Sequence, residues 1–211
     1  MKRFVCLSNV IIALGFLTIV SCESIFIFDP IDPRLPKYTE NGNNAAGAFM
    51  NKDVWKSVEK YSFLSVSNEP YLTVFTKHDS LILNFSGDIL KEKNVFLSTK
   101  INFYLKGLNI HNFSDLSTLK NKTIQLDGVN CYGAFVTDYY STNYPGCSGT
   151  AGIGQIYFRN VAIDDLNQSV TLSGTFGFTL PNSYCGSVEV SYGRFDYIFT
   201  NNSNLDITSV P

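Results

Sequence analysis

Cysteine is the residue type with the clearest chemistry in this chain. Cys22 ends the segment Ile19-Val20-Ser21-Cys22, behind a short apolar run that begins after Lys2 and Arg3. A positively charged start, a short apolar core and small residues before a cut are typical of a segment that is removed on export. The pattern predicts a bacterial lipoprotein signal, with cleavage before Cys22 and lipidation of that residue.

Lipidation would fix the location of the mature chain. Each buried methylene contributes about 0.8 kcal/mol, so several acyl chains hold a protein on a membrane. We therefore expect the membrane to be a partner through the N-terminal lipid, and the chain to be an outer-membrane lipoprotein of the cell envelope, facing the periplasm or the cell surface. Two alternatives are an uncleaved anchor helix over residues 4–20 and a secreted protein without lipid.

The remaining cysteines predict a disulfide. Export would leave Cys131, Cys147 and Cys185 in a compartment that permits disulfides. If the strands around them form a meander, the loops that hold Cys147 and Cys185 lie at one end and Cys131 lies at the other. The expected pair is therefore Cys147 with Cys185.

Residues for catalysis or metal binding are scarce. His78 and His111 are the two histidines of the chain, and neither belongs to a spaced metal motif or a triad. Asp164-Asp165 offers a calcium alternative, but a single acidic turn supplies too few oxygen ligands. We predict that the chain is not an enzyme and that it has no catalytic residues, no metal site and no cofactor.

Tyrosines mark the best candidate for binding. Residues 138–145 carry Tyr139, Tyr140 and Tyr144 among small polar residues, and Tyr184 would join them across the disulfide. Tyrosine in loops on a rigid β-scaffold is typical of binding surfaces. The expected partner is a glycan, a peptide or a protein, and the alternative is that the rings pack on their own loop.

The elements that must position these residues read as strands. Residues 95–105 and 170–180 alternate between apolar and polar side chains, which is the period of a half-buried strand. Further strands are expected at residues 61–66, 71–77, 81–86, 131–137, 154–161 and 188–199. One short helix is expected at residues 114–121, with Ser114 as its N-cap. The predicted fold is an all-β antiparallel sandwich of about ten strands, mostly a meander, with a closed or partly open barrel as the alternative.

The last strand changes phase. Val188 and Val190 share one parity, whereas Phe195, Tyr197 and Phe199 share the other, and Gly193 lies at the switch. A β-bulge there would let both sets face inward. Arg194 and Asp196 would then point outward, either as a structural clamp or as a ligand-binding pair.

Composition sets the domain organisation. With 211 residues and 45% hydrophobic content, the chain has material for one packed core. We expect a signal peptide at residues 1–21, a lipidated Cys22 and tether over 22–46, one β domain over 47–200 and a polar tail over 201–211. Removal of the signal changes the net charge from −2 to −4, and a chain without basic clusters is a poor partner for nucleic acid.

Two motifs resemble a known group of proteins. Gly47-Ala-Phe-Met-Asn-Lys-Asp-Val-Trp55 is similar to the G-x-F-x-x-N-G-x-x-W opening of uncharacterised Bacteroidota lipoproteins, although Lys52-Asp53 replaces the glycine after the asparagine. Leu172-Ser-Gly-Thr-Phe-Gly-Phe178 and Val188-Glu-Val-Ser-Tyr-Gly-Arg-Phe-Asp196 resemble the closing S-G-T-F-x-F … V-x-I-x-x-G-R-F-D pair of that group. The resemblance implies an exported β-domain on a lipid anchor and no particular activity.

Three function classes follow. The first is a non-catalytic binding module, and the second is a structural or accessory subunit of an envelope complex. A lipocalin-like carrier would need a hollow barrel, whereas large inward residues such as Phe103, Phe176 and Phe178 favour a filled core. Trp55 is expected to be a core anchor, with an exposed sugar-stacking ring as the alternative.

Overall fold

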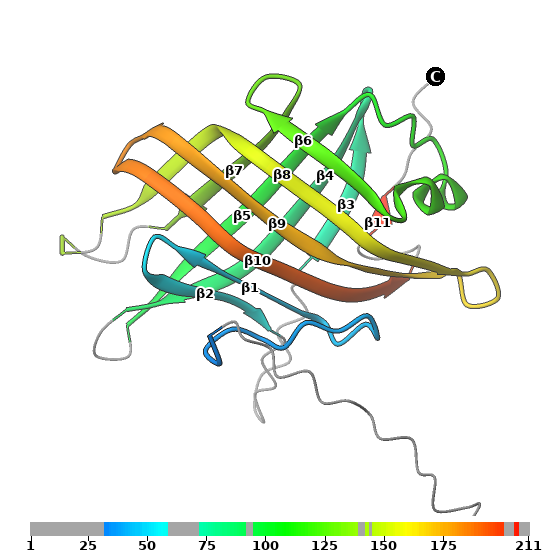
Figure 1. The fold of residues 1–211 in the computed structure, drawn as a ribbon, viewed down its shortest axis with the longest axis horizontal. Helices are drawn as coiled ribbons and strands as arrows, with labels where there is room; N and C mark the ends of the chain where they lie inside the picture. Colours follow the sequence, from blue (N-terminus) through cyan, green and yellow to red (C-terminus); the bar gives the residue numbers. More distant parts are fainter. Residues whose placement is uncertain are drawn as a thin grey trace, which may run out of the picture. The chain divides into compact units, whose positions relative to one another are not determined.

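The computed structural model describes residues 32–58, 72–91, 95–138, 142–143, 145–200 and 205–206. Nearly all of this part of the chain is β-strand (Figure 1). The signal segment with Cys22, the strand expected at residues 61–66 and the side chains of Tyr139, Tyr140 and Tyr144 lie outside the described residues. The all-β prediction is confirmed.

Eight antiparallel strands close into a barrel, because β10 pairs with β1 and β4 pairs with β5. The barrel alternative, rather than the open sandwich, is therefore the architecture (Figure 1). Around the ring the strands are β1 (Ala45–Met50), β2 (Asp53–Val58), β4 (Ser80–Leu90), β5 (Phe96–Lys106), β7 (Cys131–Thr137), β8 (Cys147–Asp164), β9 (Ser169–Ser183) and β10 (Gly186–Thr200).

Three further strands branch from the ring. β3 (Leu72–Lys77) pairs with the first half of β4, and β2 takes the second half of the same edge. In the same way β8 pairs first with β7 and then with β6 (Lys122–Asp127). β11 (Leu205–Asp206) adds a short parallel pairing to β3. The long strands β4 and β8 thus lie where the sheet divides.

Large side chains fill the barrel. The predicted inward face of β9 is buried from Val170 to Leu180 at every second residue. Facing aromatic rings pack with centroids 5.2 to 6.4 Å apart, and the cluster contains Phe85, Phe103, Phe158, Phe176, Phe178, Phe195 and Tyr197. In the described part of the chain the barrel interior is therefore filled by side chains, as the large inward residues predicted.

Trp55 is the core anchor that the sequence predicts. Its ring is fully buried, which rules out the exposed sugar-stacking alternative. Its Nε1 donates a hydrogen bond to the carbonyl oxygen of Thr99 at 3.1 Å. Thr99 belongs to β5, so the indole of β2 passes over the intervening strand β4. Gly87 makes this passage possible, because a Cβ there would lie 2.9 Å from the indole.

The connection from β5 to β6 packs against the core with a short 3-10 helix, η2 (Phe113–Leu119). Leu116 and Leu119 of η2 are fully buried. The short helix predicted at residues 114–121 is confirmed, but Ser114 is not its N-cap. The cap is Asn112, because its side chain and that of Asp115 exchange hydrogen bonds with each other's backbone N–H groups.

In the described residues no helix reaches the length and apolar character needed to cross a bilayer.

The predicted bulge in β10 is confirmed. Val190 pairs with Phe178 and Gly193 pairs with Phe176, so between these two pairs β10 has one residue more than β9. Tyr192 takes a left-handed backbone conformation at this point, with φ of 53°. The shift turns Phe195 inward and Asp196 outward, as the phase change of the sequence requires.

A strap, residues 32–44, covers the outward face of β10 (Figure 1, blue). The buried Asp196 carboxylate accepts hydrogen bonds from Thr39 Oγ1, from Ser173 Oγ at 2.7 Å, and from the backbone N–H groups of Gly42 and Asn43 at 2.8 and 3.1 Å. Burial raises the pKa of this carboxyl, but the hydrogen bonds outweigh burial and hold the pKa below its usual value.

The strap corrects the predicted tether. The sequence predicted an extended tether over residues 22–46, yet in the described part of this range Leu35 is buried and Pro36 packs directly on Gly47 of β1. The chain then enters β1 at Ala45. Asp196 is thus a structural clamp, in agreement with one of the two interpretations of the Arg194 and Asp196 pair.

Glycines in β9 give a test of the filled interior. A Cβ on Gly174 would overlap the carbonyl oxygen of Tyr157 and lie 2.7 Å from the ring of Phe195, whereas a Cβ on Gly177 would meet only the Val190 carbonyl oxygen at 3.3 Å. We expect Gly174→Ala to lower the free energy of unfolding by about 1 to 3 kcal/mol. Gly177→Ala, the matched control, should change it by no more than about 0.5 kcal/mol. Urea denaturation measures both, and equal losses would contradict the packing described here.

Candidate functional site

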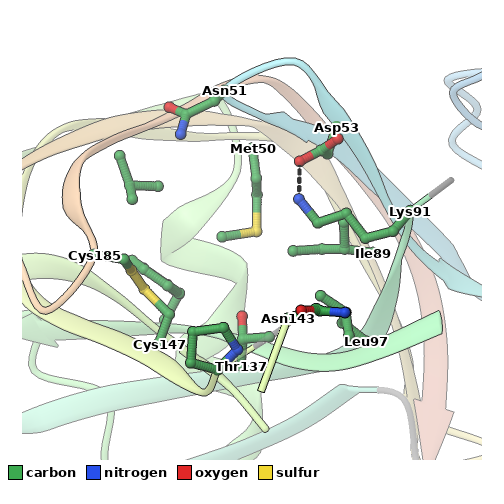
Figure 2. Close-up of a pocket in the computed structure, with 13 residues that line it drawn as sticks. Met50, Asn51, Asp53, Ile89, Lys91, Leu97, Thr137, Asn143, Cys147 and Cys185 are labelled. Atoms are coloured by element: carbon green, nitrogen blue, oxygen red, sulfur yellow. Dashed lines mark hydrogen bonds and ion pairs between the residues drawn. A yellow bond between two sulfur atoms is a disulfide. The ribbon is translucent and has the colours of Figure 1, made fainter. Parts of the chain in front are cut away.

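A pocket opens at one end of the barrel (Figure 2). We call this end the mouth and the pocket the mouth pocket. Four connections meet there: the β1–β2 turn, the β4–β5 and β9–β10 hairpins, and the β7–β8 loop. They meet because every second connection of an up-and-down barrel returns to the same end. The pocket has a volume of about 280 Å³.

The floor of the mouth pocket is apolar. It consists of buried, inward side chains near the mouth ends of five strands: Met50, Ile89, Leu97, Phe135 and Val188. Trp55 lies next to this floor, since it pairs with Ile89 in the register of β2 and β4. The aromatic core continues below, so a ligand in the mouth meets a closed floor rather than a channel.

The rim of the mouth pocket is polar. Lys91 and Asp53 form an ion pair across the ends of β4 and β2, with 28% and 38% of their side chains exposed (Figure 2). Asn51 fixes the β1–β2 turn, because its side chain accepts a hydrogen bond from the Glu189 N–H at 2.9 Å and its N–H donates to the Glu189 carbonyl oxygen at 2.7 Å. Asn143 adds an exposed amide on the opposite side of the opening.

A disulfide forms one wall. Cys147 and Cys185 are joined, with Cα atoms 5.9 Å apart and a sequence separation of 38 positions. The bond ties the start of β8 to the β9–β10 hairpin, and this confirms the predicted pairing. The backbone N–H of Tyr184 supports the same tie by donating to the Ser148 carbonyl oxygen at 3.2 Å.

The predicted tyrosine binding surface can be compared with the structure only in part. Tyr184 is 94% exposed and does not line the mouth pocket. Asn143 and Pro145 do line it, and they are sequence neighbours of Tyr144. Two residues of the predicted binding loop therefore line the mouth pocket, while its three tyrosines lie outside the described residues.

Other candidate groups serve the fold. Burial raises the pKa of the Cys131 thiol, which disfavours the reactive thiolate. Asp164 Oδ1 accepts the backbone N–H groups of Leu166 and Asn167 at 3.0 and 3.2 Å, so this carboxylate stabilises the β8–β9 turn. In the part of the chain that the structure describes, no three His, Cys, Asp or Glu side chains gather as metal ligands would.

Neither Asp53 nor Lys91 was predicted from the sequence to belong to a site. Strand alternation would have pointed to both, because Asp53 lies two residues before the inward Trp55, and Lys91 lies two residues after the inward Ile89. A charge at an inward position belongs at the end of a strand, where the barrel opens to water. The alternation could not be used, because no strand was predicted at residues 53–58 and the strand before Lys91 was predicted to end at residue 86.

Comparison of the chain with protein-family models, with curated proteins and with solved structures finds no match. The resemblance to Bacteroidota lipoproteins therefore stays a prediction.

Proposed function

We propose that this chain is an exported, lipid-anchored and non-catalytic binding protein of the bacterial cell envelope, and that it receives its ligand in the mouth pocket. The observation that carries this proposal is the contrast between a filled barrel interior and an open pocket at the mouth. Ligand sites in proteins are typically concave, with an apolar lining and a few placed polar groups. The mouth pocket has this composition.

The surroundings of the pocket support a binding role. Connections on a rigid barrel vary without cost to the core, and the disulfide holds two of them in place. The loop with Tyr139, Tyr140 and Tyr144 adjoins the pocket through Asn143 and Pro145. Tyrosine rings there would extend the contact to a glycan, a peptide or a protein.

The short chain between Cys22 and the strap would hold the barrel close to the membrane. Cys22 precedes the first described residue, Asp32, by ten positions. Even a fully extended chain of this length spans no more than about 35 Å. A lipid on Cys22 would therefore keep the barrel near the bilayer, so that its ligands are those present at the envelope surface.

The anchor makes a prediction about mass. Protein extracted from its native membrane should begin at Cys22, carry acyl chains, and gain two hydrogens on reduction of Cys147–Cys185. Intact-mass spectrometry before and after reduction measures all three, and Cys22→Ala is the control that should abolish acylation. Recovery of the unmodified full-length chain would overturn the export part of the proposal.

The pocket makes a prediction about retention. The full mature chain, in detergent, is screened against a glycan array and a peptide array. Asn143→Trp should remove retention of the bound probes, because an indole on this exposed turn covers the mouth. Leu166→Trp is the matched control, since Leu166 is 96% exposed on the β8–β9 turn, outside the residues that line the pocket.

Two results would contradict binding in the mouth. Equal retention by both variants would place the ligand elsewhere on the chain. Failure of the wild-type chain to bind any probe, on the arrays or free in solution, would favour the alternative, a structural or accessory subunit of an envelope complex. Unchanged thermal unfolding of both variants shows that folding is intact.

A further inference from the structure

The charges of the mouth pocket are arranged in a particular way. Among the described residues that line it, Asp53 and Lys91 are the charged ones, and they carry opposite signs. They lie side by side because Val54 pairs with Leu90, which makes Asp53 and Lys91 the next positions in the same register. Both side chains are partly exposed, so a ligand in the mouth can reach each of them.

This arrangement selects the charge of a ligand. A ligand with one charge would pair with one member of the ion pair and leave the other member uncompensated, which is costly in a partly buried site. A ligand with adjacent positive and negative groups gives each member a new partner. The ion pair of the protein is then exchanged for two ion pairs with the ligand, and the net charge of the site stays at zero.

The floor of the pocket selects the rest of the ligand. Met50, Ile89, Leu97 and Val188 surround the space beneath the ion pair and accept an apolar group. The volume of about 280 Å³ lies at the small end of ligand sites, which suits one residue-sized molecule. Met50 can adapt its unbranched side chain to apolar groups of different shape.

We propose that the mouth pocket binds a free α-amino acid with an apolar side chain, with its ammonium group on Asp53, its carboxylate on Lys91 and its side chain on the apolar floor. Only an α-amino acid places both charges on the carbon that also bears the apolar group. The inference rests on the proposed function, since it names the ligand class of the same pocket.

Calorimetric titration of the full mature chain tests this assignment with four probes. L-leucine carries all three recognition groups, L-leucinamide lacks the carboxylate, N-acetyl-L-leucine lacks the ammonium group, and glycine lacks the side chain. We expect L-leucine to bind at least about tenfold more tightly than each of the other three, as the loss of one charge partner or of the apolar contact dictates.

Two variants separate recognition from structural support. Asp53→Asn removes the partner of the ammonium group and releases Lys91, so it should weaken L-leucine and strengthen N-acetyl-L-leucine. Lys91→Met removes the partner of the carboxylate and releases Asp53, so it should weaken L-leucine and strengthen L-leucinamide. A merely structural ion pair would weaken all probes alike and would not invert their order. Thermal unfolding, followed through the emission of Trp55, controls for folding.

Each outcome decides the inference. The inverted order of probes in the two variants supports it. Equal affinity for L-leucine and for its two blocked derivatives overturns it, as does absence of L-leucine binding at millimolar concentration. If L-leucine fails while Asn143→Trp still removes retention of array probes, the proposed function stands and this inference alone is lost.

Discussion

Closure of the barrel is the constraint on which the rest of this structure depends. The ring closes through a short seam, in which β2 and β4 share only three residue pairs. Trp55 reinforces the seam from within by reaching over Gly87 to the Thr99 carbonyl oxygen, and so joins β2 to β5 across β4. An eight-stranded barrel has a fixed and narrow interior. A large aromatic side chain inside it therefore needs a small residue beside it, as Gly87 provides for Trp55.

A filled interior decides where function can lie. The aromatic core occupies the middle of the barrel, η2 adds Leu116 and Leu119 to the core, and the strap covers the outer face of β10 at Asp196. The mouth is the end at which apolar floor, exposed charges and variable loops coincide. The disulfide then fixes the wall of that opening without entering the core.

Local pattern predicted most of the strands, but it missed β1, β2 and β6 and did not predict the closure of the ring. Alternation with period two placed the inward faces of β5 and β9 and the bulge near Gly193, because these depend on neighbouring residues. The Cys147–Cys185 bond followed from the meander. The pairing of β1 with β10 and the docking of the strap on Asp196 join residues about 150 positions apart, and no local signal in one sequence specifies such contacts. The mouth charges were missed because Asp53 and Lys91 become neighbours only through the β2–β4 seam.

The filled core is the central claim, and Trp55 can report on it directly because it is the one tryptophan of the chain. The decisive measurement is a titration with a long-chain fatty acid that carries bromine atoms on its chain, with quenching of Trp55 emission as the signal, because bromine quenches an indole only at near contact. A filled barrel predicts short-wavelength emission from a buried indole and no saturable quenching. Saturable quenching at one fatty acid per chain would contradict it, because the apolar chain would then reach the buried indole through a hollow interior.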